Sequence, residues 1–281
     1  MKKFEGTLFC TDLDGTLFRS DKTVSEENLN AIEYFKSEGG LFTFITGRVP
    51  ATSRAICECI HPNAPYGCVN GGAIFDPQRE EYLYKELLPE GFLDLVRHVE
   101  RVLPDVGIQF NTEKEVLFIK DNPAMVRFRR LTGVPLLKRE PDEVREGVLK
   151  VVFAHDKEDV ISALQEELLR HPRAAEFDFI RSEKHLYEIL PKGVNKGSLL
   201  LRLAALLGIK KENTVAAGDY YNDVSMLRAA GVGFAVAGAV EEARRAADHI
   251  TVGNDENAIA AIIDGLDRGV YFRRTQKQEI R

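Results

Sequence analysis

Short apolar runs alternate with amphipathic stretches at the start of the chain. Each apolar run is brief and ends in polar residues or glycine, which is typical of a buried strand. Between the first two runs, Ser25 can cap a helix that the glycines at 39–40 would end. The pattern predicts strands and helices, in chain order, at 6–12, 25–38, 41–46, 50–60 and 66–70. Strands that alternate with helices in this way form a parallel sheet with right-handed crossovers.

The rhythm changes at about residue 82 and returns near residue 189. In between, Pro135, Pro141 and Pro172 interrupt the pattern, and the predicted strands follow one another across short turns. Strands joined in this way pair in the antiparallel sense, so we predict an inserted α+β segment. The elements predicted within it are helices near 89–103, 122–131 and 157–171, and strands at 107–110, 116–119, 149–155, 176–182 and 185–190.

After the insert the chain again alternates strands with helices. The elements predicted there are strands at 214–219 and 232–238, and helices at 196–207, 222–230, 240–247 and 256–265. We therefore predict an α/β fold whose parallel-sheet core comprises residues 1–81 and 189–281, with an α+β cap domain inserted at 82–188. The polar last residues, 274–281, are predicted to form a frayed tail.

The composition narrows the class of protein. With 281 residues and 44% hydrophobic side chains the chain can bury a large core. A net charge of −6 argues against nucleic-acid binding, which needs a basic surface. No apolar run is long enough to cross a bilayer, and the four cysteines have neither disulfide nor zinc-site spacing. We expect a cytoplasmic monomer or small homo-oligomer with reduced thiols, and no nucleic-acid or membrane partner.

Two aspartates stand at the end of the first predicted strand, in the stretch FCTDLDGT. Asp12 and Asp14 are two residues apart, so their side chains point the same way if the chain is extended. Gly15 allows the backbone to turn sharply after the pair. Open α/β sheets bind ligands at the carboxyl ends of their strands. We therefore expect both carboxylates to face one ligand site.

Other polar residues fall at comparable positions in the predicted core. They follow later strands or begin the helix after the insert, and they are Thr46, Gly47, Arg48, Lys196, Asp219, Asn222 and Asp223. Two carboxylates about 4 Å apart repel by roughly 4 kcal/mol at an effective dielectric constant near 20. A cluster of four therefore needs a divalent cation in addition to the lysine. Oxygen ligands without histidine or cysteine favour Mg²⁺.

A magnesium ion beside several acids suits the chemistry of phosphoryl transfer. With the cation screening the charge, Asp12 can attack a phosphate ester and form an aspartyl-phosphate. Asp14 can protonate the leaving oxygen and then activate water, while Thr46 and Lys196 bind the non-bridging oxygens. The predicted partner is a small phosphorylated metabolite. Further candidate substrate-binding residues are Gly47, Arg48 and Asn222.

These stretches resemble the four motifs of the haloacid dehalogenase superfamily. Residues 12–16 (DLDGT) are similar to its first motif and 45–48 (ITGR) to its second. Lys196 within KGVNKG is similar to the third motif, and GDYYND at 218–223 is similar to the fourth. The resemblance covers essentially the whole chain. It implies a Rossmann-like core sheet with the first strand at its centre.

The resemblance also implies a role for each acid. Asp12 would be the nucleophile and Asp14 the acid and base. Asp12, the main-chain carbonyl of Asp14 and Asp219 would bind Mg²⁺. Asp223 would lie next to the metal ligands or orient Lys196.

The position of the insert refines the resemblance. Only about 30 residues separate Asp14 from Thr46, so a large cap fits only between the second and third motifs. This arrangement resembles the Cof-like sugar-phosphatase branch, in which the cap would close over the core and read the leaving group. Tyr220 departs from the pattern, since many relatives carry a small residue there. Asn70, which precedes two glycines, is interpreted as a turn residue.

Three functions fit the motifs. The main hypothesis is a Mg²⁺-dependent phosphatase that acts on small phosphorylated metabolites, most plausibly sugar phosphates. The first alternative is a phosphomutase, which would share the chemistry of Asp12 but return the phosphoryl group to a sugar. The second is a non-catalytic sensor of a phosphorylated ligand, against which the full set of acids and Lys196 argues.

Overall fold

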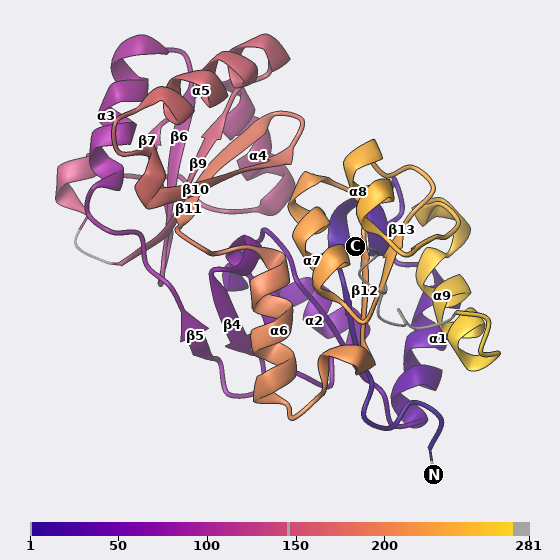
Figure 1. The fold of residues 1–281 in the computed structure, drawn as a ribbon. Helices are drawn as coiled ribbons and strands as arrows, with labels where there is room; N and C mark the ends of the chain where they lie inside the picture. Colours follow the sequence, from indigo (N-terminus) through magenta and orange to yellow (C-terminus); the bar gives the residue numbers. More distant parts are fainter. Residues whose placement is uncertain (1, 145–146, 272–281) are drawn as a thin grey trace, which may run out of the picture.

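The computed structural model describes residues 2–144 and 147–271 and confirms the predicted α/β fold. The first and last parts of the chain build one core, and the middle of the chain forms a separate layered unit beside it (Figure 1). The tail predicted at 274–281 lies outside the described residues. The fold is therefore a parallel-sheet core interrupted by an insert of mixed sheets.

The core contains a five-stranded sheet in the order β14-β13-β12-β1-β2, with all neighbours parallel. Its strands are β1 Leu8–Thr11, β2 Leu41–Phe44, β12 Thr214–Gly218, β13 Val232–Ala235 and β14 His249–Ile250. Strand β1 lies inside the sheet between β12 and β2. Its carboxyl end is thus flanked by the carboxyl ends of two other strands.

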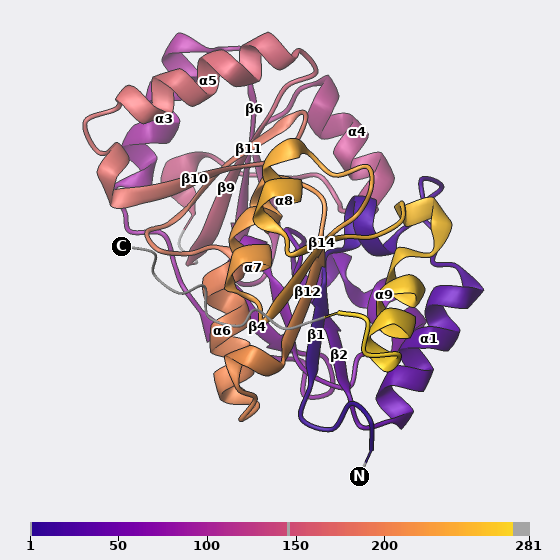
Figure 2. The same cartoon turned by 45° about the vertical axis from the view of Figure 1, so that its right-hand side comes forward.

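Helices cover both faces of this sheet (Figure 2). Helices α1 and α9 pack together on one face, and α6 packs with α7 on the other. The alternation of side chains along β1 explains this arrangement, because Phe9 joins the first group while Leu8 and Cys10 join the second. The core helices are α1 Glu26–Ser37, α2 Arg54–Ile60, α6 Lys196–Leu206, α7 Val224–Ala229, α8 Glu241–Ala246 and α9 Ala258–Asp267.

The strand predicted at 66–70 does not extend the parallel sheet as expected. It makes one isolated parallel bridge, from Gly67 to Ile45 just after β2, and belongs to a three-stranded antiparallel sheet. The chain reverses because Val69 and Asn70 adopt left-handed φ angles of 58° and 53°. The strands of this small sheet are β3 Tyr66–Cys68, β4 Ala73–Asp76 and β5 Glu81–Lys85.

The insert is built on a six-stranded sheet in the order β10-β11-β9-β6-β7-β8. Neighbouring strands in this sheet are antiparallel, as predicted for this part of the chain, except that β7 and β8 are parallel. The strands are β6 Gly107–Thr112, β7 Val116–Lys120, β8 Leu137–Lys138, β9 Val148–Ala154, β10 Phe177–Glu183 and β11 Leu186–Pro191. The helices are α3 Phe92–Val102, α4 Pro123–Thr132 and α5 Glu158–Arg170.

The two faces of the insert sheet differ in chemistry. Helices α3 and α5 pack on one face and bury an apolar cluster. Helix α4 packs on the other face, which also carries buried polar side chains toward the core. These polar residues are Gln109, Asn111, Lys150 and Glu188.

The chain crosses between core and insert near β5 and again near β11. The boundaries predicted at residues 82 and 188 fall within these two strands. Strand β5 pairs with β4, and β11 pairs with β9 and β10. The exact limits of the cap domain therefore stay a prediction.

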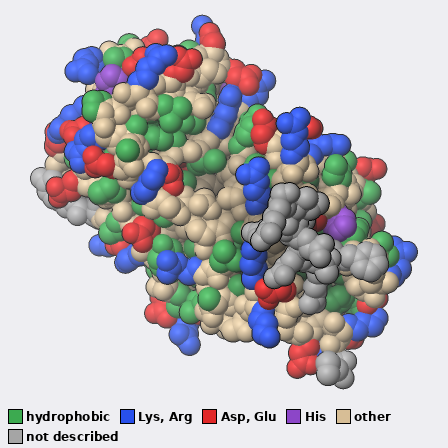
Figure 3. Space-filling model, in the orientation of Figure 1, with side chains coloured by type: hydrophobic (Ala, Val, Ile, Leu, Met, Phe, Trp, Pro, Cys, Tyr) green, Lys and Arg blue, Asp and Glu red, His purple; other side chains and the backbone are tan. Residues whose placement is uncertain are grey.

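The molecular surface carries charges of both signs. Lysine and arginine side chains are interspersed with aspartate and glutamate over both parts of the molecule (Figure 3). Within residues 2–144 and 147–271, no helix combines the length and the apolar character that a membrane span requires.

Candidate active site

Strand pairing brings together two aspartates that lie far apart in the sequence. Asp12 follows β1 and Asp219 follows β12, and these strands are paired in register, with Thr11 opposite Ala217. The backbone N–H of Asp12 donates to the carbonyl of Ala217 at 2.8 Å, which extends the pairing by one residue. Both carboxylates therefore emerge at the same edge of the sheet.

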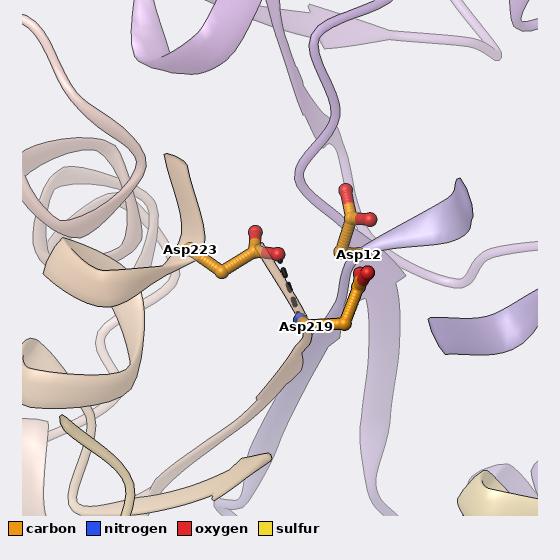
Figure 4. A group of neighbouring side chains, drawn as sticks. All are labelled: Asp12, Asp219 and Asp223. Atoms are coloured by element: carbon orange, nitrogen blue, oxygen red, sulfur yellow. Dashed lines mark hydrogen bonds between the residues drawn. The ribbon is translucent and has the colours of Figure 1, made fainter. Parts of the chain in front are cut away.

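A third acid completes a compact group. Asp12, Asp219 and Asp223 each offer a carboxylate oxygen, and these oxygens all lie within 4.8 Å of one another. Figure 4 shows the three side chains gathered at the strand ends. Asp223 is fully buried and Asp12 is 7% exposed. Three carboxylates thus share a small volume, in which Asp12 and Asp223 are buried and Asp219 is partly exposed.

Lys196 lies directly against two of these acids. It is the first residue of α6, whose N-terminus is capped by the side chain of Asn195. Its Nζ donates to Oδ1 of Asp12 and to Oδ1 of Asp223, both at 2.6 Å. The lysine side chain is fully buried, so these charge-assisted bonds are shielded from water.

The carboxylate of Asp223 stabilises the turn after β12 through hydrogen bonds. One of its oxygens binds Lys196, and the other accepts the backbone N–H groups of Asp219 at 2.9 Å and Tyr220 at 3.1 Å. The first of these backbone bonds is drawn in Figure 4. Asp223 therefore fixes both the ammonium group and the acid that follows the strand. The ring of Tyr220 lies edge-on to Tyr221, with 4.9 Å between centroids.

The turn after β1 packs against Asp219. Gly15 has a left-handed φ of 85°, and a Cβ atom at this position would collide with the Asp219 carboxylate. The hydroxyl of Thr16 donates to Oδ1 of Asp219 at 2.9 Å. Thr16 was not among the predicted site residues, although its place in the DLDGT motif could have indicated it.

When ionised, the carboxylates of Asp12, Asp219 and Asp223 carry more negative charge than the single ammonium group of Lys196 can neutralise. Burial raises the pKa of Asp12 well above its usual range, and the neighbouring Asp223 raises it further. Burial and Asp223 also raise the pKa of Asp219 to about 7. Burial disfavours the charge on Lys196, but the carboxylates of Asp12 and Asp223 outweigh this and raise its pKa. The site therefore favours the uptake of another cation.

The donor atoms fit a magnesium ion. The clustered ligands are carboxylate oxygens, with neither histidine nor cysteine among the three residues, and Mg²⁺ prefers oxygen ligands. Both oxygens of Asp223 already bind protein hydrogen-bond donors. Among the described residues, Lys196 binds Oδ1 of Asp12 and Thr16 binds Oδ1 of Asp219, which leaves Oδ2 of each acid as the better placed ligand.

The carboxylate of Asp14 does not join this cluster. It receives two nitrogens of Arg48, with the shortest ion-pair distance 2.9 Å, and Nζ of Lys22 at 2.9 Å. Burial alone would raise the pKa of Asp14, but Arg48 and Lys22 lower it below its usual value. Arg48 also lies 5.2 Å from the centroid of the Phe18 ring. Asp14 is thus held as an ionised partner of two cations beside the acid cluster.

The loop after β2 is held at the same edge of the sheet. Thr46 is buried, and its hydroxyl accepts the backbone N–H of Arg48 at 3.2 Å. The carbonyl of Thr46 accepts the N–H of Asn70 at 3.0 Å, and the carbonyl of Arg48 accepts that of Val69 at 2.9 Å. A Cβ atom on Gly47 would lie 3.0 Å from the Asn70 amide group. The loop 46–48 and the turn 69–71 therefore form one closely packed unit.

Two buried amides connect this unit to the fourth motif. Asn222 donates through Nδ2 to Oδ1 of Asn70 at 2.9 Å. Among the described residues, the Asn222 Oδ1 atom is buried without a hydrogen-bond partner. The structure thus brings predicted residue Asn222 together with Asn70, which was interpreted only as a turn residue. An asparagine in a left-handed turn is common, so this second contact has little signal in the sequence.

Comparison with known proteins agrees with this geometry. A family model described as haloacid dehalogenase-like hydrolase matches residues 9–263. A 5-amino-6-(5-phospho-D-ribitylamino)uracil phosphatase of Bacillus subtilis is 29% identical, over 92% of this chain and 98% of its own length. A putative phosphatase of the same organism is 30% identical, over 92% of this chain and 97% of its own length.

Solved structures share the same architecture. A haloacid dehalogenase-like hydrolase from Bacteroides thetaiotaomicron superposes with a TM-score of 0.79 at 26% identity, covering 92% of this chain and 98% of its own. A sugar phosphatase of HAD subclass IIB superposes with a TM-score of 0.81 at 23% identity, covering 94% and 100%, and shares the fold. With the four motifs meeting at one sheet edge, this chain belongs to the haloacid dehalogenase-like hydrolase family.

Proposed function

We propose that this enzyme is a Mg²⁺-dependent phosphatase that hydrolyses small phosphorylated metabolites through an aspartyl-phosphate on Asp12. Family membership and the phosphatases among the matched relatives make its class that of a phosphoric monoester hydrolase.

One observation carries the assignment of the nucleophile. Asp12 is buried at a strand end, and Lys196 donates to its Oδ1 at 2.6 Å while Asp223 holds the other side of the ammonium group. A carboxylate oriented in this way presents its second oxygen in a fixed direction. Such preorganisation is what an attack on phosphorus requires.

Asp12, Asp219 and the main-chain carbonyl of Asp14 would hold the magnesium ion. The ion would supply charge neutralisation for the phosphoryl oxygens and the attacking carboxylate. Asp223 keeps Lys196 and Asp219 in place through the bonds described above. Lys196 and Thr46 would bind the non-bridging oxygens, where negative charge builds up during transfer.

The reaction proceeds in two balanced steps. In the first, an oxygen of Asp12 forms a bond to phosphorus while the ester P–O bond breaks, and Asp14 gives its proton to the leaving oxygen. In the second, Asp14 takes a proton from water, whose oxygen bonds to phosphorus as the Asp12–phosphorus bond breaks. Phosphate leaves and both aspartates return to their starting states. To carry the proton, Asp14 must give up part of its pairing with Arg48 and Lys22.

The substrate proposed is a phosphorylated polyhydroxy compound, with sugar phosphates first among them. One relative is named for a substrate with a phosphorylated ribityl chain, and a protein of the same fold is named a sugar phosphatase. Both kinds of molecule carry a phosphate ester on a chain of hydroxyl-bearing carbons. On the buried polar face of the insert sheet, the Oε1 atom of Gln109 has no hydrogen-bond partner among the described residues, and we propose it as an acceptor for a hydroxyl of such a chain.

A phosphate-release screen tests this proposal. Purified full-length protein with Mg²⁺ would be incubated with sugar phosphates, ribityl phosphates and other phosphorylated metabolites. We expect phosphate release from some of them, loss of activity with a chelator, and recovery on adding Mg²⁺. No phosphate release without a bisphosphate activator, and isomerisation of a sugar phosphate when the activator is added, would instead indicate a phosphomutase. Tight binding of one metabolite without any release would indicate a sensor.

A further inference from the structure

Two charged residues of the insert are buried against the core. Lys150 in β9 is 3% exposed and Glu188 in β11 is 2% exposed, and Nζ of the lysine lies 2.8 Å from Oε2 of the glutamate. Both stand on the polar face of the insert sheet. A buried pair of this kind is weak evidence for stability, because desolvation offsets the attraction between the charges. Its other contacts are therefore the more informative feature.

Each partner also makes one hydrogen bond to the phosphate-binding side of the core. Nζ of Lys150 donates to the carbonyl of Gly47 at 2.8 Å. Oε2 of Glu188 accepts Nδ2 of Asn70 at 2.8 Å, while Oε1 accepts the hydroxyl of Ser182 at 2.5 Å. Hydrogen bonds from the ion pair thus cross the junction, one to the loop 46–48 and one to the turn 69–71.

The turn that Glu188 holds is conformationally unfavourable. Val69 and Asn70 both have left-handed φ angles, and for a β-branched residue such as valine this conformation is a clear outlier. Strained conformations persist only where the surroundings fix them firmly. Here the backbone bonds to Thr46 and Arg48 fix the turn from below, and the Glu188–Asn70 bond fixes it from the insert.

We propose that Lys150 and Glu188 are positioning residues that make the geometry of the phosphate-binding loop depend on the docked insert. This inference deepens the proposed function and rests on it for the role of the loop. When the insert is docked, the pair fixes the Gly47 carbonyl and the Asn70 amide, and through Asn70 the amide of Asn222. When the insert moves away, the Gly47 carbonyl and the side-chain amides of Asn70 and Asn222 are no longer held by the ion pair. Closure of the insert would then assemble the site as well as cover it.

The test compares amide hydrogen exchange in four variants of the full-length protein. Lys150→Met and Glu188→Gln each break the pair. Lys150→Met/Glu188→Leu removes both charges together and leaves no uncompensated charge, so it keeps the test available if a single variant fails to fold. Asp121→Asn is the matched control, because Asp121 pairs with Arg129 at 2.7 Å and both residues belong to the insert.

The amides of Val69 and Asn70 are the reporters, since they donate to the carbonyls of Arg48 and Thr46. We expect their exchange to become about tenfold faster in the three junction variants and to stay unchanged in Asp121→Asn. Unchanged exchange in the folded double variant would overturn the proposal. Equal acceleration in Asp121→Asn would overturn it too, because it would indicate general loosening of the insert.

A kinetic measurement separates positioning from simple structural support. For a phosphate ester that the wild type hydrolyses, the double variant should lose about 10- to 100-fold in kcat, with a smaller change in KM. If the double variant only contained less folded, active protein, with kcat per active molecule unchanged, the positioning role would be contradicted. The exchange result does not depend on catalysis. If the wild-type protein released no phosphate, the proposed function would be wrong. The hydrogen-exchange rates of Val69 and Asn70 would still decide whether the insert restrains the loop.

Discussion

Two buried lysines of this protein each lie against carboxylates, but the balance of charge around them differs. Lys196 in the core meets Asp12 and Asp223, with Asp219 close by, so one cation serves three acids. Lys150 at the junction forms an ion pair with Glu188, and it donates another hydrogen bond to the neutral carbonyl of Gly47. The comparison teaches that an excess of buried acid marks a place prepared for a further cation, whereas a balanced pair holds a geometry.

The surroundings of the two groups reinforce this distinction. The cluster around Lys196 raises the pKa of Asp12 and of Asp219, so its acids are poorly satisfied as anions without another cation. Around Lys150, the Glu188 carboxylate receives a hydroxyl and an amide as well as the ammonium group. The first group can therefore gain from a ligand, and the second is already complete.

The largest expected effect comes from removing the nucleophile. Asp12→Asn should lower phosphate release by about 10⁴-fold or more, because the amide cannot form the covalent intermediate. The fold should persist, since the substitution removes a buried acid whose charge is unfavourable in the metal-free protein. Circular dichroism and a phosphate assay would check this, with the surface variant Asp264→Asn as control. Substantial activity in Asp12→Asn would refute covalent catalysis by this residue.

The second prediction breaks each lysine group in turn. Lys196→Met leaves two buried carboxylates without their cation and should cost about 3–5 kcal/mol of unfolding free energy at pH 7. Lys150→Met should cost less, because Glu188 keeps two neutral donors. The Lys196→Met loss should shrink at pH 5, where Asp12 takes up a proton more easily. Urea titrations at both pH values measure this, and equal losses at pH 7 would contradict the comparison.

The third prediction concerns magnesium and pH. The pKa of Asp219 rises from 3.8 to about 7 in the metal-free fold, so the folded state binds more protons than the unfolded chain between these values. The contribution of this group to stability therefore decreases as the pH rises through that window. Added Mg²⁺ replaces the proton, so it should raise the melting temperature more at pH 8 than at pH 6.

Thermal melts with and without Mg²⁺ at the two pH values provide the measurement. We expect an increase of several degrees at pH 8 when Mg²⁺ is well above its dissociation constant. Asp219→Asn should largely remove this increase, while Glu188→Gln should keep it. A magnesium effect that is the same at both pH values, or that survives in Asp219→Asn, would show that the ion binds elsewhere.

The smallest effect is expected at the contact between Gly47 and Asn70. In Gly47→Ala the new Cβ atom would lie 3.0 Å from the Asn70 amide, which Glu188 and Asn222 hold in place. Because the amide has little freedom to move, kcat/KM should fall by about tenfold, with a smaller change in stability. Adding Glu188→Gln should change this loss in a non-additive way. Strict additivity of the two effects would argue against a shared restraint.

Much of the fold could be predicted because the core pattern is local. Apolar runs such as residues 6–12 and 41–46 specify buried strands, and alternating helices then require parallel pairing. The hairpin formed by β4 and β5 was not predicted. The strand before it was assigned to the parallel sheet because Asn70 and the two glycines after it indicate a turn without specifying which strand pairs next. A single turn thus decided the pairing of three strands.

The candidate site could be predicted where its residues belong to spaced motifs. Asp12, Lys196, Asp219 and Asp223 meet as the motif order implied. The partners of Asp14 were not predicted, because they depend on side-chain packing after the turn at Gly15. Lys150 and Glu188 were missed as well, although each is a charged residue inside an apolar strand, in LKVVFA and LYEILP. A charged residue inside an apolar strand indicates a buried polar partner, which here is the other member of the pair.

The most direct test of the central claim is to trap the covalent intermediate. The enzyme would be mixed with substrate and Mg²⁺, quenched in acid during turnover and digested, and the phosphorylated peptide would be identified by mass spectrometry. The account predicts a phosphoryl group on Asp12, absent without Mg²⁺ and absent in Asp12→Asn. A phosphoryl group on any other residue, or full turnover by the Asp12→Asn variant, would contradict it.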